Sequence, residues 1–373
     1  MTFLIISHTE HYRANDQLYA YAPYVREMNL WLKFVEEVHI IAPVSVDFDQ
    51  NINVAYKHPK ISIKDVPAFS LIGFKEKLST LKSLPKILNI MYCAMQQADH
   101  IHLRCPGNMG LLGCIVQIFF PKTCKTAKYA GNWDPKSKQP WSYKLQKWIL
   151  SNTWLTKNMK VLVYGEWPNQ TKNIKPFFTA TYREEEKKAY KIRNYTQALH
   201  FCFVGSLSKG KQPEKAIELV EKLRKEGKDV VLHIYGEGPQ RNTIEGQIKN
   251  NRLEDSVFLY GNQPKARVKE ALQHCHFLIL PSKSEGWPKV VAEAMFWGCI
   301  PIITPISCIP WILDDGNRGI LMKDKDIDET VESLQTLLET PQQLETVAAH
   351  AAEWSRHYTL DKFEEEIRKL IND

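Results

Sequence analysis

The feature that most constrains the fold is a regular alternation of short apolar runs and amphipathic segments in the second half of the chain. The apolar runs read ALHFCFVGS, DVVLHIYGEG, SVFLYG, HFLILPS and CIPIIT, and a helical pattern follows each of them, the last over about 328–338. This alternation is typical of strand–helix–strand units, in which helices cover both faces of a parallel sheet. We therefore predict a Rossmann-like domain over residues 196–355.

The first half begins in the same way. A strand, FLIIS, precedes an expected helix over 17–34 and a second strand, VHIIAP, and later segments such as HIHLRCP and TAKYAGN repeat the pattern. We predict a second α/β domain over residues 1–190. A charged linker over 183–195 overlaps the end of this domain. Because ligands bind at the carboxyl ends of strands in such sheets, two domains of this kind can face each other across a cleft.

Hydrophobicity gives no sign of a membrane span. The longest apolar stretch, residues 111–120, is far shorter than the roughly 20 residues that a spanning helix needs. The apolar run at the amino terminus is short and lacks a basic leader, which distinguishes it from a signal peptide. We expect a cytoplasmic protein.

Positive charge is concentrated in the first half. Residues 1–195 contain 27 Lys and Arg against 15 Asp and Glu, whereas the whole chain has a net charge of only +7. An ordinary solvated surface, an anionic acceptor and an anionic membrane surface all fit this excess. Segments 74–88 and 137–150, in which Lys alternates with apolar residues, are the candidates for peripheral membrane contact. No motif for binding nucleic acid accompanies the charge.

The sequence offers no convincing metal site. None of the eight cysteines forms a C-x-x-C pair, and most lie in apolar runs, so we expect reduced core residues. The D-x-D motif formed by Asp47 and Asp49 lies in an unsuitable fold context. We expect no metal and no cofactor.

The segment over 282–298, SKSEGWPKVVAEAMFWG, carries the clearest functional signal. A loop with Glu285 and Gly286 precedes a predicted helix that has Pro288 at its first position and Gly298 at its end. The N–H groups of Lys289 and Val290 at such a helix start suit a diphosphate. The carboxylates of Glu285 and Glu293 suit the hydroxyl groups of a sugar and a ribose.

This segment resembles the E-x7-E signature of family 4 glycosyltransferases, which are retaining enzymes of the GT-B fold. The resemblance implies that Glu285 contacts the donor sugar and Glu293 the ribose, with Gly286, Trp287, Lys289 and Val290 beside them. It extends over 196–350, and the stretch SRHYTLDKFEEEIRKL looks like the family's last helix, so residues 356–373 are expected to pack on the first domain.

Two further segments are similar to the same family. FVGSLSKGK places Lys211 where the family's lysine neutralises the donor diphosphate, beside Gly205, while Ser206 replaces the usual Arg and Lys209 is a substitute cation. IYGEGPQR is similar to the family's G-x-G-P loop and places Gly236 and Gly238 at a tight turn near the nucleotide. Without a third glycine it is only half of a dinucleotide fingerprint.

The first domain resembles one subgroup of the family in HLRCPGNMGLLG and KYAGNWDP. The family's usual His is missing there, so a polar role in the active site falls to Asn132 or Asp134. The acceptor-side candidates are Arg104 and, in the loop SHTEHYRAN, His8, His11 and Arg13. A structural histidine is the alternative for His8 and His11.

We therefore expect a glycosyltransferase that moves a sugar from a UDP- or GDP-linked donor to a glycan or lipid-linked acceptor with retention, in polysaccharide or glycoconjugate biosynthesis. Lys211, Glu285, Asn132 and Asp134 are the catalytic candidates. The alternatives are a nucleotide-sugar epimerase of the same fold and a degenerate, non-catalytic GT-B partner subunit. A dinucleotide oxidoreductase is the least favoured interpretation, because neither half has a complete fingerprint.

Overall fold

A computed structural model describes residues 1–373 except 50–51, 68–73, 323–326 and 373. The chain divides into two compact units, which we call unit 1 (residues 1–177 and 363–373) and unit 2 (residues 178–362). Unit 1 thus ends earlier than the expected residue 190, because the segment that follows packs on unit 2: Phe178 lies against Tyr358 with ring centroids 4.8 Å apart.

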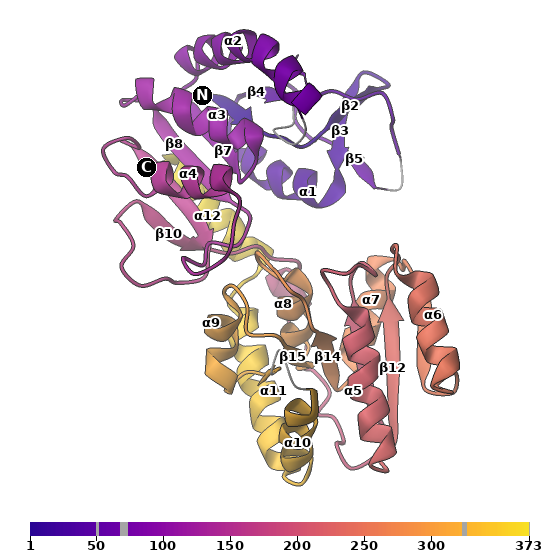
Figure 1. Cartoon of the computed structure of the whole chain (residues 1–373). Coiled ribbons are helices and arrows are strands. Elements are labelled where there is room, and N and C mark those ends of the chain that lie inside the picture. Colours follow the sequence, from indigo (N-terminus) through magenta and orange to yellow (C-terminus); the bar gives the residue numbers. More distant parts are fainter. Residues whose placement is uncertain (50–51, 68–73, 323–326, 373) are drawn as a thin grey trace. The chain divides into compact units, whose positions relative to one another are not determined.

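Unit 1 is built on a parallel sheet in the order β10-β9-β8-β7-β1-β4-β6 (Figure 1). Its strands are β1 (Thr2–Ile6), β4 (Glu37–Ala42), β6 (Ile61–Asp65), β7 (His100–Cys105), β8 (Cys124–Tyr129), β9 (Met159–Tyr164) and β10 (Ile174–Phe177). Side chains alternate between the two faces of each strand, so every strand contributes to two layers of core.

Helices cover both faces of this sheet. Leu4, Leu103 and Tyr129 belong to the buried layer under α2 (Phe74–Gln96), α3 (Asn108–Val116) and α4 (Trp141–Leu150). The opposite face carries Phe3, His102 and Lys128, which pack against α1 (Ala22–Trp31) and α12 (Leu360–Asn372). Short 3₁₀ turns extend α1 and α3, over Leu32–Phe34 and Gln117–Phe119.

The expected helix over 17–34 is wrong in its first third. Residues 11–21 form a hairpin of β2 (His11–Ala14) and β3 (Gln17–Tyr21), to which β5 (Asn53–Ala55) adds a third strand. The turn residues Asn15 and Asp16 both have positive φ, which Asn and Asp tolerate in a two-residue hairpin turn. Pro23, early in α1, then fits a helix start at Ala22.

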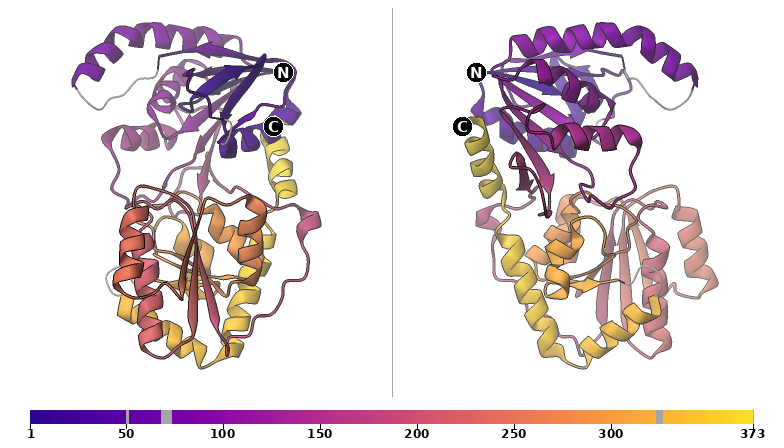
Figure 2. Two further views of the ribbon diagram at one scale, coloured as in Figure 1. Left: turned by 90° about the vertical axis from the view of Figure 1, so that its right-hand side faces the viewer. Right: turned by 60° about the vertical axis from the view of Figure 1, so that its left-hand side comes forward.

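Unit 2 contains the predicted parallel sheet, in the order β13-β12-β11-β14-β15-β16, with helices on both sides (Figure 2). The strands are β11 (Leu199–Val204), β12 (Val230–Tyr235), β13 (Val257–Gly261), β14 (Phe277–Leu280), β15 (Ile300–Ile303) and β16 (Ile320–Leu321). The helices are α5 (Pro213–Lys225), α6 (Arg241–Asn250), α7 (Lys265–His274), α8 (Lys289–Phe296), α9 (Ile309–Leu313), α10 (Ile327–Leu338) and α11 (Pro341–Arg356). Two 3₁₀ turns cover Glu184–Glu186 and Asp314–Gly316.

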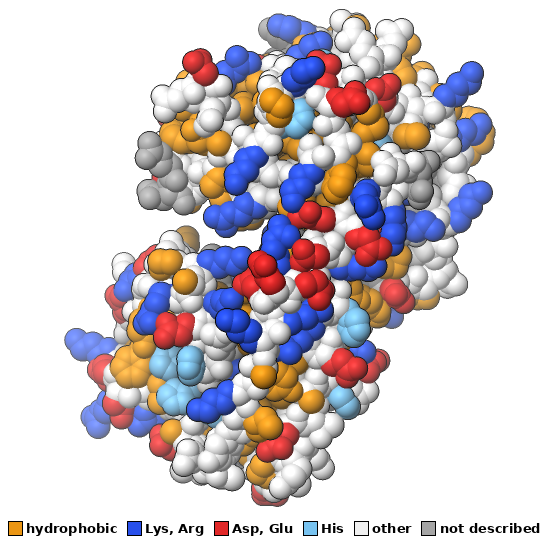
Figure 3. Space-filling view, turned by 180° about the vertical axis from the view of Figure 1, so that it is seen from behind, with side chains coloured by type: hydrophobic (Ala, Val, Ile, Leu, Met, Phe, Trp, Pro, Cys, Tyr) orange, Lys and Arg blue, Asp and Glu red, His pale blue; other side chains and the backbone are white. Residues whose placement is uncertain are grey.

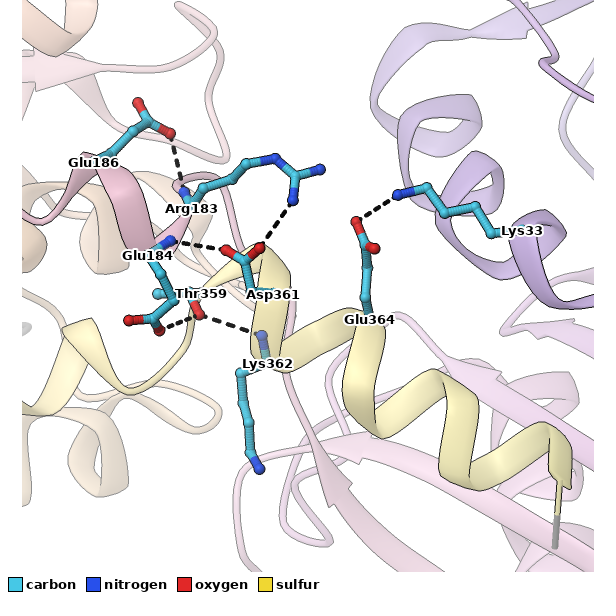
Figure 4. A network of polar contacts seen from close by, with 8 residues as sticks. All are labelled: Lys33, Arg183, Glu184, Glu186, Thr359, Asp361, Lys362 and Glu364. Carbon is cyan, nitrogen blue, oxygen red and sulfur yellow. Dashed lines mark hydrogen bonds and ion pairs between the residues drawn. The ribbon is translucent and has the colours of Figure 1, made fainter.

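The charged segment 183–195, expected as a linker, is fixed to unit 2. The buried guanidinium of Arg193 donates to the carbonyl oxygens of Gly298 (2.7 Å), Leu272 (2.9 Å) and Trp297 (3.0 Å). At the other end of the segment, Arg183 Nη1 and the Glu184 N–H donate to the carboxylate of Asp361 (Figure 4). Side-chain and backbone contacts therefore hold it in place despite its charge.

The last helix, α12, begins in unit 2 and continues in unit 1. Thr359 precedes it, and its hydroxyl oxygen accepts a hydrogen bond from the N–H of Lys362, as an N-cap residue does (Figure 4). Within unit 1, Glu364 of α12 pairs with Lys33 at 2.8 Å, and Phe363 packs on Phe177. This helix contributes the residues that complete one face of the unit 1 core.

Candidate functional site

The loops at the carboxyl ends of the unit 2 strands bring the predicted donor-side residues together. The loop after β11 contains Gly205 and Lys211, and its Gly210 carbonyl accepts a hydrogen bond from the N–H of Lys283 (2.8 Å) in the loop after β14. Parallel strands end at the same edge of the sheet, so segments some 75 residues apart in the chain become neighbours.

Gly236 and Gly238 allow the loops after β11 and β12 to touch. A Cβ atom on Gly236 would lie 1.9 Å from the carbonyl oxygen of Gly205, and one on Gly238 would lie 2.5 Å from that of Leu207. The close approach is stabilised by hydrogen bonds from the Leu207 N–H to Glu237 O and from the Gln240 N–H to Leu207 O, both 2.9 Å. These glycines are needed for backbone contact between two loops of the site.

An ion pair lies at the centre of these loops. Lys211 Nζ is 2.5 Å from Glu285 Oε1, and the Glu285 side chain is only 9% exposed while that of Lys211 is 29% exposed. The pair joins the two residues that the sequence singled out as phosphate and sugar contacts. A cation and a carboxylate held together in this way are already positioned to bind a ligand with both anionic and hydroxyl groups.

The helix that follows Glu285 starts one residue later than predicted. Pro288 is the N-cap with φ −76° and ψ 90°, and α8 runs from Lys289 to Phe296. Its first turn presents the N–H groups of Lys289 and Val290, which an α-helix leaves without carbonyl partners of its own. Gly298 follows the helix with φ +68°, in agreement with its predicted place at the helix end.

Glu293, the second carboxylate of the signature, contacts the segment that enters unit 2. Its Oε1 accepts a hydrogen bond of 2.6 Å from the Thr181 hydroxyl. Burial, and next to it the carboxylate of Glu293, raise the pKa of the neighbouring Tyr182 phenol. Thr181 is a residue of this site that sequence reasoning missed, because no motif surrounds it.

Three other donor-side candidates differ in their surroundings. Trp287 is 7% exposed and packs among the rings of Trp311, Trp354 and Tyr358, so its side chain belongs to the core of unit 2. Ser206 is exposed, and its hydroxyl lies 3.2 Å from that of Ser208. Lys209, the suggested substitute cation, is also exposed.

In unit 1, the acceptor-side candidates lie in different surroundings. His11 is fully buried; its Nδ1 lies 2.8 Å from Thr9 O and its Nε2 lies 2.8 Å from the Tyr56 hydroxyl. Arg13 lies on the hairpin strand β2, where it donates to Ile63 O. These two residues do not lie in a loop at a strand end as expected, because the hairpin starts at His11.

Of the two histidine candidates only His8 lies at a strand end, where its ring is partly enclosed by neighbouring atoms and the residue still reaches solvent. It follows β1, and its ring lies against Gly107, where an added Cβ atom would be 2.8 Å from Nδ1. Burial, and after it the positive charge of Arg104, lower the pKa of this imidazole. The histidine is therefore a neutral donor or acceptor at neutral pH.

Arg104 is part of a buried ion cluster. Glu27 Oε1 accepts from Arg104 Nη1 at 2.7 Å and lies 3.1 Å from Lys128 Nζ, and the Glu27 and Lys128 side chains are 5% and 1% exposed. Lys128 also lies over the ring of Phe363, 5.0 Å from its centroid. This cluster could not be predicted from the sequence, since no motif surrounds Glu27 in its helix or Lys128 in its strand.

Asn132 and Asp134 stabilise their own loop after β8. Asn132 Oδ1 accepts from the Asp134 N–H, and Asp134 Oδ1 accepts from the Lys136 N–H, each at 2.8 Å. Lys147 of α4 donates to the carbonyl oxygen of Asp134 at 3.0 Å. Both side chains are half-buried at the strand end, where turn formation occupies one oxygen of each.

Comparisons with known proteins agree with this architecture. Residues 184–354 match the family model for glycosyl transferases group 1. Alpha-D-kanosaminyltransferase of Streptomyces kanamyceticus is 26% identical over 150 residues, 40% of this chain and 39% of the relative. N-acetyl-alpha-D-glucosaminyl L-malate synthase of Bacillus anthracis is 30% identical over 135 residues, 36% of this chain and 34% of the relative. The chain thus matches well under half the length of these two curated relatives.

A solved structure extends the likeness to the whole chain. The Anabaena HepE protein, in complex with UDP and glucose, superposes with a TM-score of 0.69 at 13% identity and covers 100% of this chain and 99% of its own. The chain therefore has the predicted GT-B fold, and the match to the group 1 family model lies within unit 2.

No helix among the described residues is long and apolar enough to span a membrane. No group of three or more His, Cys, Asp and Glu side chains in the described part of the chain could hold a metal ion.

Proposed function

We propose that the protein is a glycosyltransferase that transfers a sugar from a nucleotide-sugar to a hydroxyl group of a glycan or lipid-linked acceptor. The observation that carries this proposal is the Lys211–Glu285 pair, which lies at the carboxyl edge of the unit 2 sheet inside the region that matches the group 1 family model. UDP is the first nucleotide to test, because the structural neighbour HepE was solved with UDP and glucose; GDP is the second.

The chemistry follows from where charge develops. The bond between the anomeric carbon and the phosphate oxygen breaks, a bond from the acceptor oxygen forms, and the acceptor proton passes to the departing phosphate. Lys211 and the first-turn N–H groups of α8 would stabilise the negative charge on that phosphate, while Glu285 would accept hydrogen bonds from the sugar hydroxyls. Attack from the side on which the leaving group departs would retain the anomeric configuration.

This arrangement requires no metal ion, because the lysine and the helix start supply the positive charge. We expect transfer to continue in excess EDTA. Loss of activity in EDTA that magnesium or manganese restores would contradict this part of the proposal.

The decisive experiment compares Lys211→Met with the wild type in two assays. UDP binding, measured by calorimetry, is expected to weaken by about 1.5–3 kcal/mol, the range for a hydrogen bond to a charged group, and transfer from the preferred UDP-sugar is expected to fall further. Lys215→Met, on the same unit outside the loop, is the control. Unchanged UDP affinity in Lys211→Met would refute the assignment.

Incubation with the donor alone separates the alternatives. An epimerase of the same fold would convert the sugar without any acceptor, whereas a transferase would leave it intact or slowly hydrolyse it. A non-catalytic partner subunit, for which exposed Ser206 in place of the family's arginine is the argument, would bind the nucleotide without turning it over.

Peripheral membrane contact is proposed on one helix. In α4, Trp141 and Trp148 are 66% and 60% exposed, and Lys144 is exposed between them. The spacing of three and seven residues places all three on one helix face, as in helices that lie in a membrane interface. The other candidate segment, residues 74–88, lies partly outside the residues whose side chains are described.

A further inference from the structure

Unit 1 contains a cavity of about 870 Å³ at the edge of its sheet opposite to the strand ends discussed above. It opens where β7, β8, β9 and β10 begin, and His100, Lys125 and Lys160 line it from three of these strands. Lys157, Lys172 and Lys175 complete its cationic lining. The parallel register aligns Lys125 with Met159 and His100 with Cys124, so the amino ends of the strands form one wall.

Lysines dominate the charged part of the cavity lining. Five of its lining residues are lysines, and none of the described residues around it is acidic. Like charges at one site repel each other, and an anion bound among them reduces this repulsion. On the face drawn in Figure 3, Lys and Arg side chains are interspersed with Asp and Glu side chains.

One lysine of the cavity is held inside the fold. Lys125 is 2% exposed, and its Nζ donates to the carbonyl oxygen of Phe120 at 2.5 Å. Burial lowers the pKa of this ammonium group to about 8. A single backbone carbonyl is a weak partner for a buried cation, and the ammonium group has further protons to donate.

His100 supplies a second buried polar group. It is 1% exposed, its Nε2 lies 2.9 Å from the Thr126 hydroxyl, and its Nδ1 has no hydrogen-bond partner. In the tautomer in which Nε2 accepts from that hydroxyl, Nδ1 carries a proton and is a donor without an acceptor. Buried donors of this kind are rare and usually mark a missing water or ligand.

We propose that this cavity is a binding site for a phosphate-bearing anion. Lys125, Lys157, Lys172 and Lys175 suit the concentrated charge of phosphate, and the volume exceeds what a single inorganic phosphate fills. The site is separate from the proposed donor site, which lies in unit 2. A free phosphate compound and the headgroup of an anionic lipid share this chemistry.

Two exposed aromatic residues are sequence neighbours of residues at the cavity. Trp154, 73% exposed, is next to Thr153 of the cavity wall, and Phe119, 69% exposed, is next to the Phe120 that accepts from Lys125. Aromatic side chains beside a basic pocket are typical of proteins that bind lipid headgroups. The test therefore has one arm for each source.

The variant Lys157→Gln/Lys172→Gln/Lys175→Gln removes three exposed charges from the cavity and leaves Lys125 in place. The control Lys57→Gln/Lys60→Gln/Lys64→Gln removes as many exposed charges from unit 1, outside both the cavity and α4. Thermal melting checks that both full-length variants are folded. Saturating UDP is present throughout, so that the probe does not report on the donor site.

The first arm measures binding of inorganic pyrophosphate by calorimetry. The second measures flotation with phosphatidylcholine vesicles with and without phosphatidylglycerol, and Trp141→Ala/Trp148→Ala is added to every protein in this arm so that the proposed α4 contact does not contribute. We expect the wild type and the control to bind in at least one arm, and the cavity variant to lose about tenfold or more in affinity. Pyrophosphate binding indicates a soluble ligand, and binding to phosphatidylglycerol vesicles alone indicates a lipid. Absence of binding in both arms, or equal loss in cavity and control variants, overturns the proposal. UDP affinity of the cavity variant, measured separately, is expected to equal that of the wild type and tests the donor site independently.

Discussion

At the scale of single residues, Glu27 has the largest expected effect on stability. It is the carboxylate that both Arg104 and Lys128 contact inside unit 1. Glu27→Gln keeps the shape and removes the charge, which leaves two buried cations without their counter-ion. We expect the free energy of unfolding to fall by about 3–5 kcal/mol, measured by urea denaturation.

The double variant Glu27→Gln/Lys128→Met is the control for that prediction. Removing one of the two cations together with the carboxylate is expected to recover part of the lost stability, since the two residues are coupled. The single variant Lys128→Met completes the comparison. If the stability losses of Glu27→Gln and Lys128→Met simply add in the double variant, the two residues are not coupled.

Replacement of the single residue Glu293 tests the proposed contact with the ribose. We expect Glu293→Ala to weaken binding of the free nucleoside diphosphate by about 1–3 kcal/mol, because hydroxyl groups of the ligand lose their acceptor. Thr181→Val is the matched control: it removes the hydrogen bond to Glu293 Oε1 but keeps the carboxylate. Equal calorimetric affinities of Glu293→Ala and wild type would exclude this role.

At the scale of elements, α4 carries the proposed membrane contact. We expect the wild type to float with anionic vesicles at low salt, since exposed Trp side chains insert at the interface and lysines attract the lipid charge. Trp141→Ala/Trp148→Ala is expected to lose most of this binding. Its melting temperature is expected to stay near that of the wild type, because both rings are more than half exposed.

The control for α4 is Trp287→Ala, which removes a buried ring of unit 2 and is expected to lower stability without any specific effect on flotation of the folded fraction. Binding of the α4 variant equal to that of the wild type would assign the membrane contact elsewhere or remove it altogether.

At the scale of the whole molecule, buried histidines predict a loss of stability in mild acid. Burial lowers the pKa values of His11, His100 and His276 to about 4. In the unfolded chain these groups titrate near 6.5, so between about pH 6.5 and 4 the unfolded state binds more protons than the folded state. The contribution of the neutral, buried histidines to the free energy of unfolding is therefore fully present above about pH 6.5, and it is lost as the pH decreases towards 4.

Each of the three histidines changes the free energy of unfolding by up to about 1.4 kcal/mol per pH unit in this interval. Urea denaturation at several pH values between about 7.5 and 5 measures it. His11→Asn is expected to reduce the slope, and the exposed His350→Asn is expected to leave it unchanged. A free energy of unfolding that stays constant across this interval would contradict the prediction.

Local patterns were sufficient for the strand–helix order of unit 2 and for the loops that carry its glycines. The apolar runs predicted β11, β12, β13, β14 and β15, and the pattern over 328–338 agrees with α10 at Ile327–Leu338. These features are visible in the sequence because periodicity and turn chemistry act over a few residues. The hairpin over 11–21 was missed, although Asn15 and Asp16 between Tyr-containing segments favour a two-residue turn between strands.

What the amino-acid sequence determined by itself is the order of elements, the two Rossmann-like units and the residue types available at the strand ends. What only the tertiary structure decided is which of these residues meet. It paired Lys211 with Glu285, buried His11, joined Glu27 to Arg104 and Lys128, and placed five lysines around one cavity. The physical reason is that parallel strands align residues far apart in the chain at one sheet edge, and no local pattern encodes such neighbours.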